Sequence, residues 1–137
     1  MKKSLLITWS LLGSFLLAGL LVGCSKSEEA EADKSVNVPA QIEALKGQDQ
    51  NAVQTACGEL GKAGPLAAPA VPALITLLKN DDALTRRLAA YALCRIGPAA
   101  KAALPALEAL RTDPDQLVGQ QTESALKAID PQKYGRY

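Results

Sequence analysis

Two cysteines, Cys57 and Cys94, could carry thiol chemistry in the body of the chain. They could be joined by a disulfide, act as a redox pair, or be two small buried side chains. A redox pair usually has the spacing C-x-x-C, which the chain lacks. We therefore expect two buried side chains, with a disulfide as the alternative.

Acidic pairs are the next residues that could form a site, because clustered carboxylates can bind calcium. The pairs are Asp81 with Asp82 and Asp113 with Asp115. Neither pair has the spacing or the closing Glu of an EF-hand, and an Asp before a helix commonly caps it. The chain has no His, which removes the commonest general base and the usual metal ligand. We predict a protein that is not an enzyme and has no metal site and no cofactor.

An N-terminal targeting segment is indicated by residues 5–22, which carry no charge and follow Lys2 and Lys3. A basic start, an apolar middle and small residues at the end are typical of a secretory signal, which is excluded from the folded protein. A single membrane-spanning helix is the alternative, but the run is near the lower limit of length and includes several polar residues. We expect residues 1–23 to be a signal peptide.

The end of this segment, Leu21-Val22-Gly23-Cys24, resembles the lipobox of bacterial lipoproteins. The resemblance implies cleavage after Gly23 and lipidation of Cys24 with acyl chains such as palmitate. Two or three chains anchor a protein stably, since each buried methylene contributes about 0.8 kcal/mol. Ser25 stands where an Asp would resemble an inner-membrane retention signal, which favours the outer membrane and the periplasm. The expected location is the cell envelope, with the membrane as a partner through the lipid anchor.

Residues 24–37 are rich in charge and poor in large apolar side chains, so we expect a flexible linker after the lipidated cysteine. The whole chain has a net charge of +1, and the balance becomes slightly acidic without the two lysines of the signal. A near-neutral protein has no field that would gather a polyanion. We predict no nucleic-acid partner.

A period of 33 residues runs through the rest of the chain, where Pro, Asp, Leu and Gly recur in the same columns. Each unit contains a capped helix with an apolar face, a Gly-Pro stop, and a second helix that begins near a Pro. Ala and Leu dominate, and the single Trp and the single Phe both precede Cys24, which suits closely packed helices. The pattern predicts helices at residues 39–46, 50–63, 71–79, 83–96, 104–111 and 116–129.

Seven columns of this repeat are distinctive: Asp82, Arg86, Ala89, Leu93, Gly97, Pro105 and Leu107. They resemble HEAT-like repeats, especially the short Ala- and Pro-rich type related to the phycobilisome-lyase repeat. The resemblance covers residues 38–131 and leaves 132–137 as a C-terminal tail. It implies an all-α fold, a short α-solenoid of about three helical pairs that bury a continuous core. It also implies that the second, shorter helices line the concave side, and that Asp and Arg form a ladder between units.

Exposed positions on the shorter helices would form a ridge that binds another protein. We expect this ridge to contain Glu43, Lys46, Thr76, Lys79 and Arg111, flanked by the loop residues Asn80, Asp81 and Thr112. The C-terminal residues Tyr134 and Tyr137 either fold back over the last helix or form a docking tail.

The sequence favours a lipid-anchored envelope protein whose HEAT-like solenoid serves as a protein-binding scaffold or adaptor. One alternative is a structural subunit or spacer of an envelope complex. Another is a thiol-based redox or ligand-binding protein that uses Cys57 and Cys94. The sequence names no particular partner protein.

Overall fold

The computed structural model describes residues 32–136 of the 137-residue chain. The predicted signal peptide, the cleavage site after Gly23, the lipidated Cys24 and the linker up to residue 31 lie outside the described residues, as does Tyr137.

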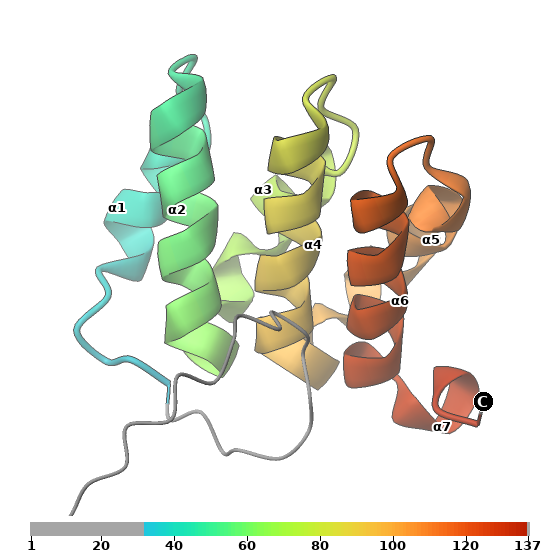
Figure 1. The fold of residues 1–137 in the computed structure, drawn as a ribbon. Coiled ribbons are helices and arrows are strands. Elements are labelled where there is room, and N and C mark those ends of the chain that lie inside the picture. The colour runs from blue at the N-terminus through green and yellow to red at the C-terminus, as the bar shows by residue number, and fades with distance from the viewer. Residues whose placement is uncertain (1–31, 137) are drawn as a thin grey trace, which may run out of the picture.

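The described residues form helices and contain no strand, which confirms the predicted all-α solenoid (Figure 1). Three pairs, each made of a short and a long helix, are followed by a C-terminal turn. The elements are α1 (Val38–Ala44), α2 (Gln50–Ala63), η1 (Gly64–Ala70), α3 (Val71–Leu77), α4 (Ala83–Ile96), η2 (Gly97–Ala103), α5 (Leu104–Ala109), η3 (Leu110–Thr112), α6 (Gln116–Ile129) and α7 (Pro131–Tyr134), where η denotes a 3-10 helix.

The three long helices α2, α4 and α6 begin in the same way. Each has an Asp at its N-cap, Asp49, Asp82 or Asp115, whose carboxylate accepts hydrogen bonds from early backbone N–H groups. Such a cap satisfies donors that have no partner within the helix and complements the helix dipole. Gly64 and Gly97 end α2 and α4 with positive φ angles of 55° and 71°, a conformation that side chains with a Cβ rarely adopt.

Seven-residue links of 3-10 structure follow α2 and α4: η1 begins at Gly64 and η2 at Gly97, and η2 departs from helical geometry at Ala100. Each begins with Gly-Pro, where the proline fixes a helical φ at a position whose N–H would have no partner within the helix. Alanines on the inner side of these links are fully buried, so the turns pack directly against the core.

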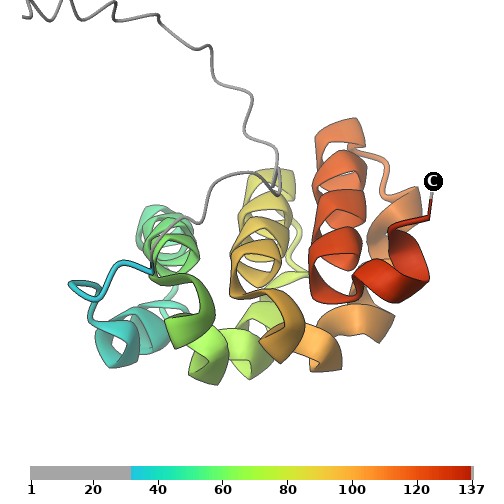
Figure 2. The same cartoon turned by 90° about the horizontal axis from the view of Figure 1, so that it is seen from below.

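The solenoid has two layers. The long helices α2, α4 and α6 lie side by side in one layer, and the short helices α1, α3 and α5 form the other (Figures 1 and 2). Both views show the short helices spread further apart than the long ones, so the short helices lie on the convex side. The expectation that they line the concave side is therefore wrong. The long helices contact one another directly, whereas η1 and η2 lie between successive short helices and hold them apart.

The core runs between the layers and is made mainly of Leu and Ala. The equivalent leucines Leu60, Leu93 and Leu126 of the three long helices are all fully buried. From the other layer, Leu74 and Leu107 meet them and are also fully buried. Neighbouring units thus share one continuous core, which is how repeat proteins gain stability that a single unit cannot reach.

Cys57 lies in this core as a free, fully buried cysteine. A disulfide between Cys57 and Cys94, which the sequence left open, is therefore absent, and the two residues are one helical turn out of register on neighbouring helices. Cys94 is also buried, with 4% of its surface exposed. Burial raises the pKa of the Cys57 thiol to about 12, which keeps it protonated and argues against a reactive thiolate.

One stretch of the described chain, Gln50–Leu77, is apolar and long enough by composition to cross a membrane. It is not a single helix, because it contains α2, η1 and α3 and turns at Gly64. Its apolar residues include Leu60 and Leu74 of the core. The apolar character of this stretch is accounted for by packing within the solenoid.

The chain enters the solenoid at the C-terminal end of α2. The backbone N–H of Asp33 donates to the carbonyl of Lys62 at 3.0 Å, and Val36 packs against the core. Whatever precedes residue 32 therefore starts from the end of the long helices where Gly64 and Gly97 lie.

The other end of the chain closes the last unit. The turn α7 contacts α6, and Tyr134 is half-buried against the core. Its hydroxyl donates to the carboxylate of Glu108 in α5, which also accepts from Lys133 at 2.9 Å. Tyr134 therefore folds back over the last helices, which is the first of the two arrangements expected from the sequence; the other was a docking tail.

The two glycines of α2 should respond oppositely to alanine. A Cβ at Gly61 would lie 2.5 Å from Cε1 of Tyr91, whereas nothing lies within 4 Å of a Cβ at Gly58. We expect Gly58→Ala to raise the free energy of unfolding by about 0.5–1 kcal/mol through helix propensity. Gly61→Ala should lower it, because Tyr91 must move. Denaturant unfolding of both variants measures the difference, and equal stabilisation by both would contradict the packing of Tyr91 against Gly61.

Candidate functional site: the loop edge

The loops that lead from the short helices into the long ones gather on one edge of the solenoid. We call this the loop edge and define it by residues 46–49, 79–82 and 113–115, which lie at the N-terminal ends of α2, α4 and α6 (Figure 1). It holds all three Asp caps and two of the three residues expected to flank a binding ridge, Asn80 and Asp81, whereas Thr112 lies beside it in η3. It lies at the opposite end of the long helices from the point where the chain enters.

The middle loop is held by a set of short hydrogen bonds. The amide oxygen Oδ1 of Asn80 accepts from the N–H of Asp82 at 2.9 Å. Oδ2 of Asp82 accepts from both the N–H and the hydroxyl of Thr85 at 2.7 Å, and from the amide of Gln54 in α2 at 3.0 Å. The bonds from Thr85 are the main cause that lowers the pKa of the Asp82 carboxyl, so this carboxylate is charged at neutral pH.

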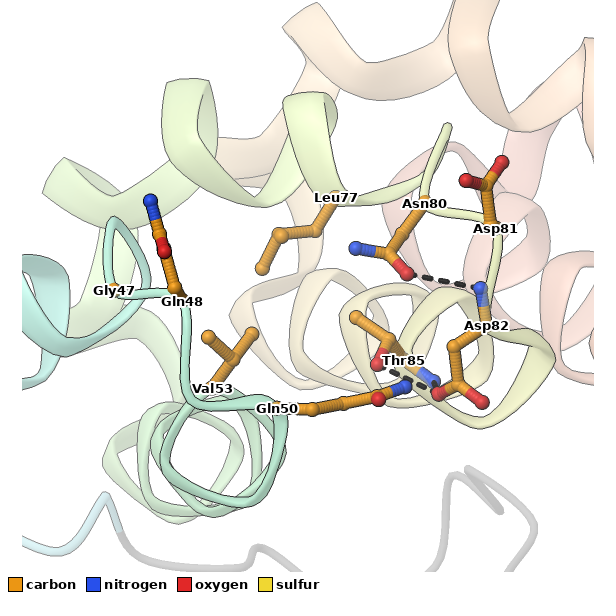
Figure 3. A pocket seen from close by; sticks show the side chains of 9 residues that line it. All are labelled: Gly47, Gln48, Gln50, Val53, Leu77, Asn80, Asp81, Asp82 and Thr85. Atoms are coloured by element: carbon orange, nitrogen blue, oxygen red, sulfur yellow. Dashed lines mark hydrogen bonds between the residues drawn. The ribbon is translucent and has the colours of Figure 1, made fainter.

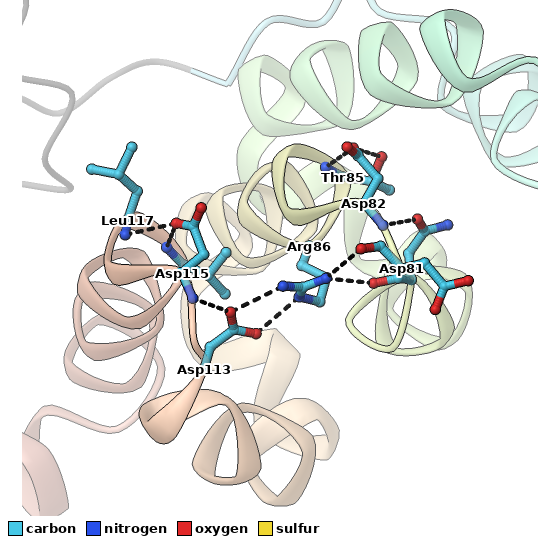
Figure 4. Close-up of polar contacts among 9 residues, drawn as sticks. Asp81, Asp82, Thr85, Arg86, Asp113, Asp115 and Leu117 are labelled. Carbon is cyan, nitrogen blue, oxygen red and sulfur yellow. Dashed lines mark hydrogen bonds and ion pairs between the residues drawn. The ribbon is translucent and has the colours of Figure 1, made fainter.

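Arg86 joins the middle loop to the last one (Figure 4). Its Nε and Nη2 donate to the two carboxylate oxygens of Asp113 at 2.9 and 3.0 Å, a bidentate ion pair. Its Nη1 donates to the carbonyls of Asn80 and Asp81 at 2.8 and 2.9 Å. The Arg86 and Asp113 side chains are only 13% and 4% exposed. One Asp–Arg contact between units, of the kind that the resemblance implied, is present here between Arg86 and Asp113.

A pocket of about 630 Å³ opens on the same edge between α2 and α4 (Figure 3). Val53 and Leu77 form its apolar wall. Polar groups come from Asn80 and Asp82. The remaining lining residues are Gly47, Gln48, Gln50, Asp81 and Thr85. The pocket thus combines an apolar wall with amide and carboxylate groups.

The residues that were expected to form the ridge are all exposed: Glu43, Lys46, Thr76, Lys79 and Arg111. The structure does not bring them into one cluster. Glu43 and Lys46 form an ion pair on α1 at 2.7 Å, the Thr76 hydroxyl donates to the carbonyl of Pro72, and Arg111 pairs with Glu123 of α6 at 2.6 Å. Lys46 and Lys79 lie on the loop edge itself, and Arg111 lies in η3 beside it.

The acidic residues of the edge act as caps and ion-pair partners. Within residues 32–136, no three His, Cys, Asp or Glu side chains converge in the way that a metal ion needs. The loop edge offers hydrogen-bonding and charged side chains beside the pocket.

The arrangement of stacked helical pairs around a continuous core defines a short α-solenoid. A family model of HEAT repeats matches residues 38–127. The chain belongs to the HEAT repeat family. No curated protein matches the chain with significant similarity. HEAT repeats commonly serve as protein-interaction scaffolds, and this is the general role that the family indicates.

Proposed function

We propose that the protein is a lipid-anchored, non-enzymatic adaptor of the cell envelope, which binds another protein at the loop edge of its HEAT solenoid. The observation that carries this proposal is the position of the chain entry. Asp33 bonds to Lys62 at the C-terminal end of α2, whereas Asp49 and the loop edge lie at its N-terminal end. An anchor on the preceding segment would therefore be attached at the end of the solenoid opposite the loop edge, which leaves the loop edge free for a partner.

The size of the domain supports this arrangement. The 14 residues of α2 separate the two ends by about 21 Å, at 1.5 Å per residue. Residues 24–31, between the proposed lipidated Cys24 and the described domain, carry mostly charged and small side chains, which suits a spacer. A partner at the loop edge could thus be held near the membrane without contact between the binding surface and lipid.

The anchor itself can be tested at Cys24. The motif Leu21-Val22-Gly23-Cys24 leads us to expect that Cys24→Ala abolishes incorporation of radiolabelled palmitate and leaves an uncleaved or soluble chain. Metabolic labelling followed by membrane fractionation measures both effects. Acyl labelling that persists unchanged in Cys24→Ala would contradict the lipid anchor, and Cys57→Ala is the matched control that should keep its label.

The binding surface can be tested by a triple substitution. We expect the combined changes Lys46→Ala, Lys79→Ala and Asp81→Ala to lower the recovery of a crosslinked partner several-fold with little change in melting temperature, because all three side chains are exposed on the loop edge. The matched control replaces Lys62, Lys101 and Lys127, which are also exposed and lie in the last turns of α2, η2 and α6. Equal recovery from both triple variants would move the binding surface elsewhere.

A further inference from the structure

The two junctions between the long helices share corresponding hydrogen bonds but differ in their side chains. Arg86 at the α4–α6 junction and Val53 at the α2–α4 junction are 33 residues apart. Their N–H groups make the same first helical bond, to the carbonyls of Asp82 and Asp49 at 3.1 and 3.0 Å. The two positions are therefore structurally equivalent, and one bears a guanidinium where the other bears only a short apolar side chain.

The partner of the guanidinium has an equivalent as well. Asp113, which pairs with Arg86, corresponds to Asn80. Both side chains accept from the N–H two residues later, of Asp115 and Asp82, at 2.9 Å. At the α2–α4 junction, the uncharged amide oxygen of Asn80 thus takes the place of the Asp113 carboxylate oxygen.

The pocket lies at the position where the guanidinium is missing. It is lined by Val53 and Asn80, the equivalents of the ion pair. It is also lined by Gly47 and Gln48, the equivalents of the two residues whose carbonyls accept from Arg86. Each group that surrounds the guanidinium at the second junction therefore has a counterpart around the open space at the first (Figures 3 and 4).

The charge around the pocket suits a cation. Asp82 lines it as a carboxylate whose pKa is lowered by its bonds from Thr85, and Asp81 adds an exposed carboxylate. The ammonium group of Lys46, which precedes the pocket residue Gly47, is paired with Glu43 at 2.7 Å. Val53 and Leu77 offer an apolar wall to the methylene stem of a long side chain.

We propose that this pocket receives an arginine side chain of the partner protein, which completes between molecules the contact that Arg86 makes within the chain. The proposal rests on the function proposed above and specifies the chemistry of the partner. The arginine stem would lie along Val53 and Leu77, and its guanidinium would face the loop of Gly47 and Gln48, with Asp82 and Asn80 opposite.

The test uses the full-length, ¹⁵N-labelled chain in detergent micelles, with N-acetyl-arginine methylamide as the probe. The backbone amide chemical shifts of Gln48, Asn80 and Thr85 should change as the probe is added and reach a plateau at saturation. N-acetyl-norleucine methylamide, which has a stem without a guanidinium, should leave them in place. Asn80→Asp, which recreates the acidic member of the second junction, should tighten binding about fivefold, because it adds a charge within a few ångströms of the cation.

A second variant fills the pocket from within. Val53→Arg places a guanidinium where Arg86 sits at the next junction and should abolish the probe-dependent shifts. Absence of shifts in the native chain, shifts of equal size with the norleucine probe, or binding that Asn80→Asp does not tighten would each overturn the proposal. None of these results depends on the partner protein. The adaptor function is therefore tested separately, by crosslinking in cells.

Discussion

Leu93→Ala is expected to lower the free energy of unfolding by about 2–5 kcal/mol, through the loss of transfer free energy and the cavity that remains. Leu93 is fully buried in α4, and α4 is the only long helix of the described solenoid that packs against two other long helices. A solenoid of three helical pairs has little stability to spare, so the change should loosen all units together. Denaturant unfolding followed by circular dichroism gives the difference.

The matched control for this prediction is Leu84→Ala. Leu84 lies in the first turn of the same helix and is 40% exposed, so the same atoms are removed without a buried cavity. We expect its effect to be well below that of Leu93→Ala. Similar losses for the two variants would mean that the predicted layer of leucines between the helices is not where the stability lies.

Arg86→Ala is expected to cost about 1–3 kcal/mol of unfolding free energy. The substitution removes two bonds to Asp113 and two to backbone carbonyls, and leaves a carboxylate that is only 4% exposed without its cation. An exposed pair contributes less than about 1 kcal/mol and a deeply buried one about 3–5 kcal/mol when one partner is lost. The Arg86 pair lies at the edge of the domain, which places it between these limits. Thermal unfolding measures the loss.

Acid unfolding separates the ion pair from simple loss of packing. Hydrogen bonds from Arg86 lower the pKa of the Asp113 carboxyl below its ordinary 3.8. A carboxyl whose pKa is lower in the folded state stabilises the protein above pH 3.8 and loses that contribution as the pH falls below it. Asp113→Asn should therefore be less stable than the native chain at pH 7 and approach its stability as the pH falls through the lowered pKa of Asp113. Arg86→Ala should lose part of its deficit over the same range and keep the rest, because its two bonds to backbone carbonyls do not titrate. A constant difference over that range would contradict the ion pair.

The long helices could be predicted from sequence because local signals set both of their ends. The ranges 50–63, 83–96 and 116–129 agree with α2, α4 and α6. An Asp cap starts each of the three, Gly64 and Gly97 stop the first two, and an apolar face of period 3.6 runs between. The short helices were predicted slightly too long, because the last turns of α3 and α5 loosen into turn or 3-10 structure.

The features that sequence reasoning missed depend on how units stack. The curvature of the solenoid follows from η1 and η2 lying between the short helices. No local sequence pattern indicates how far apart the short helices lie. The partner of Arg86 was missed because Asp113 lies 27 residues away and reaches it only when α4 and α6 pack. The pocket could have been found by alignment of the repeats, since Val53 and Asn80 depart from the columns of Arg86 and Asp113.

Site-specific photo-crosslinking in intact cells tests the central claim, that the lipid-anchored solenoid binds a protein at its loop edge. A photoreactive amino acid is placed at Gln48, which is exposed beside the pocket, or at Lys101, which is exposed in η2 near the opposite end of the long helices. The account predicts a discrete adduct with one protein from Gln48 and none of the same mass from Lys101. Mass spectrometry that finds no protein adduct at Gln48, or the same adducts at both positions, would contradict it.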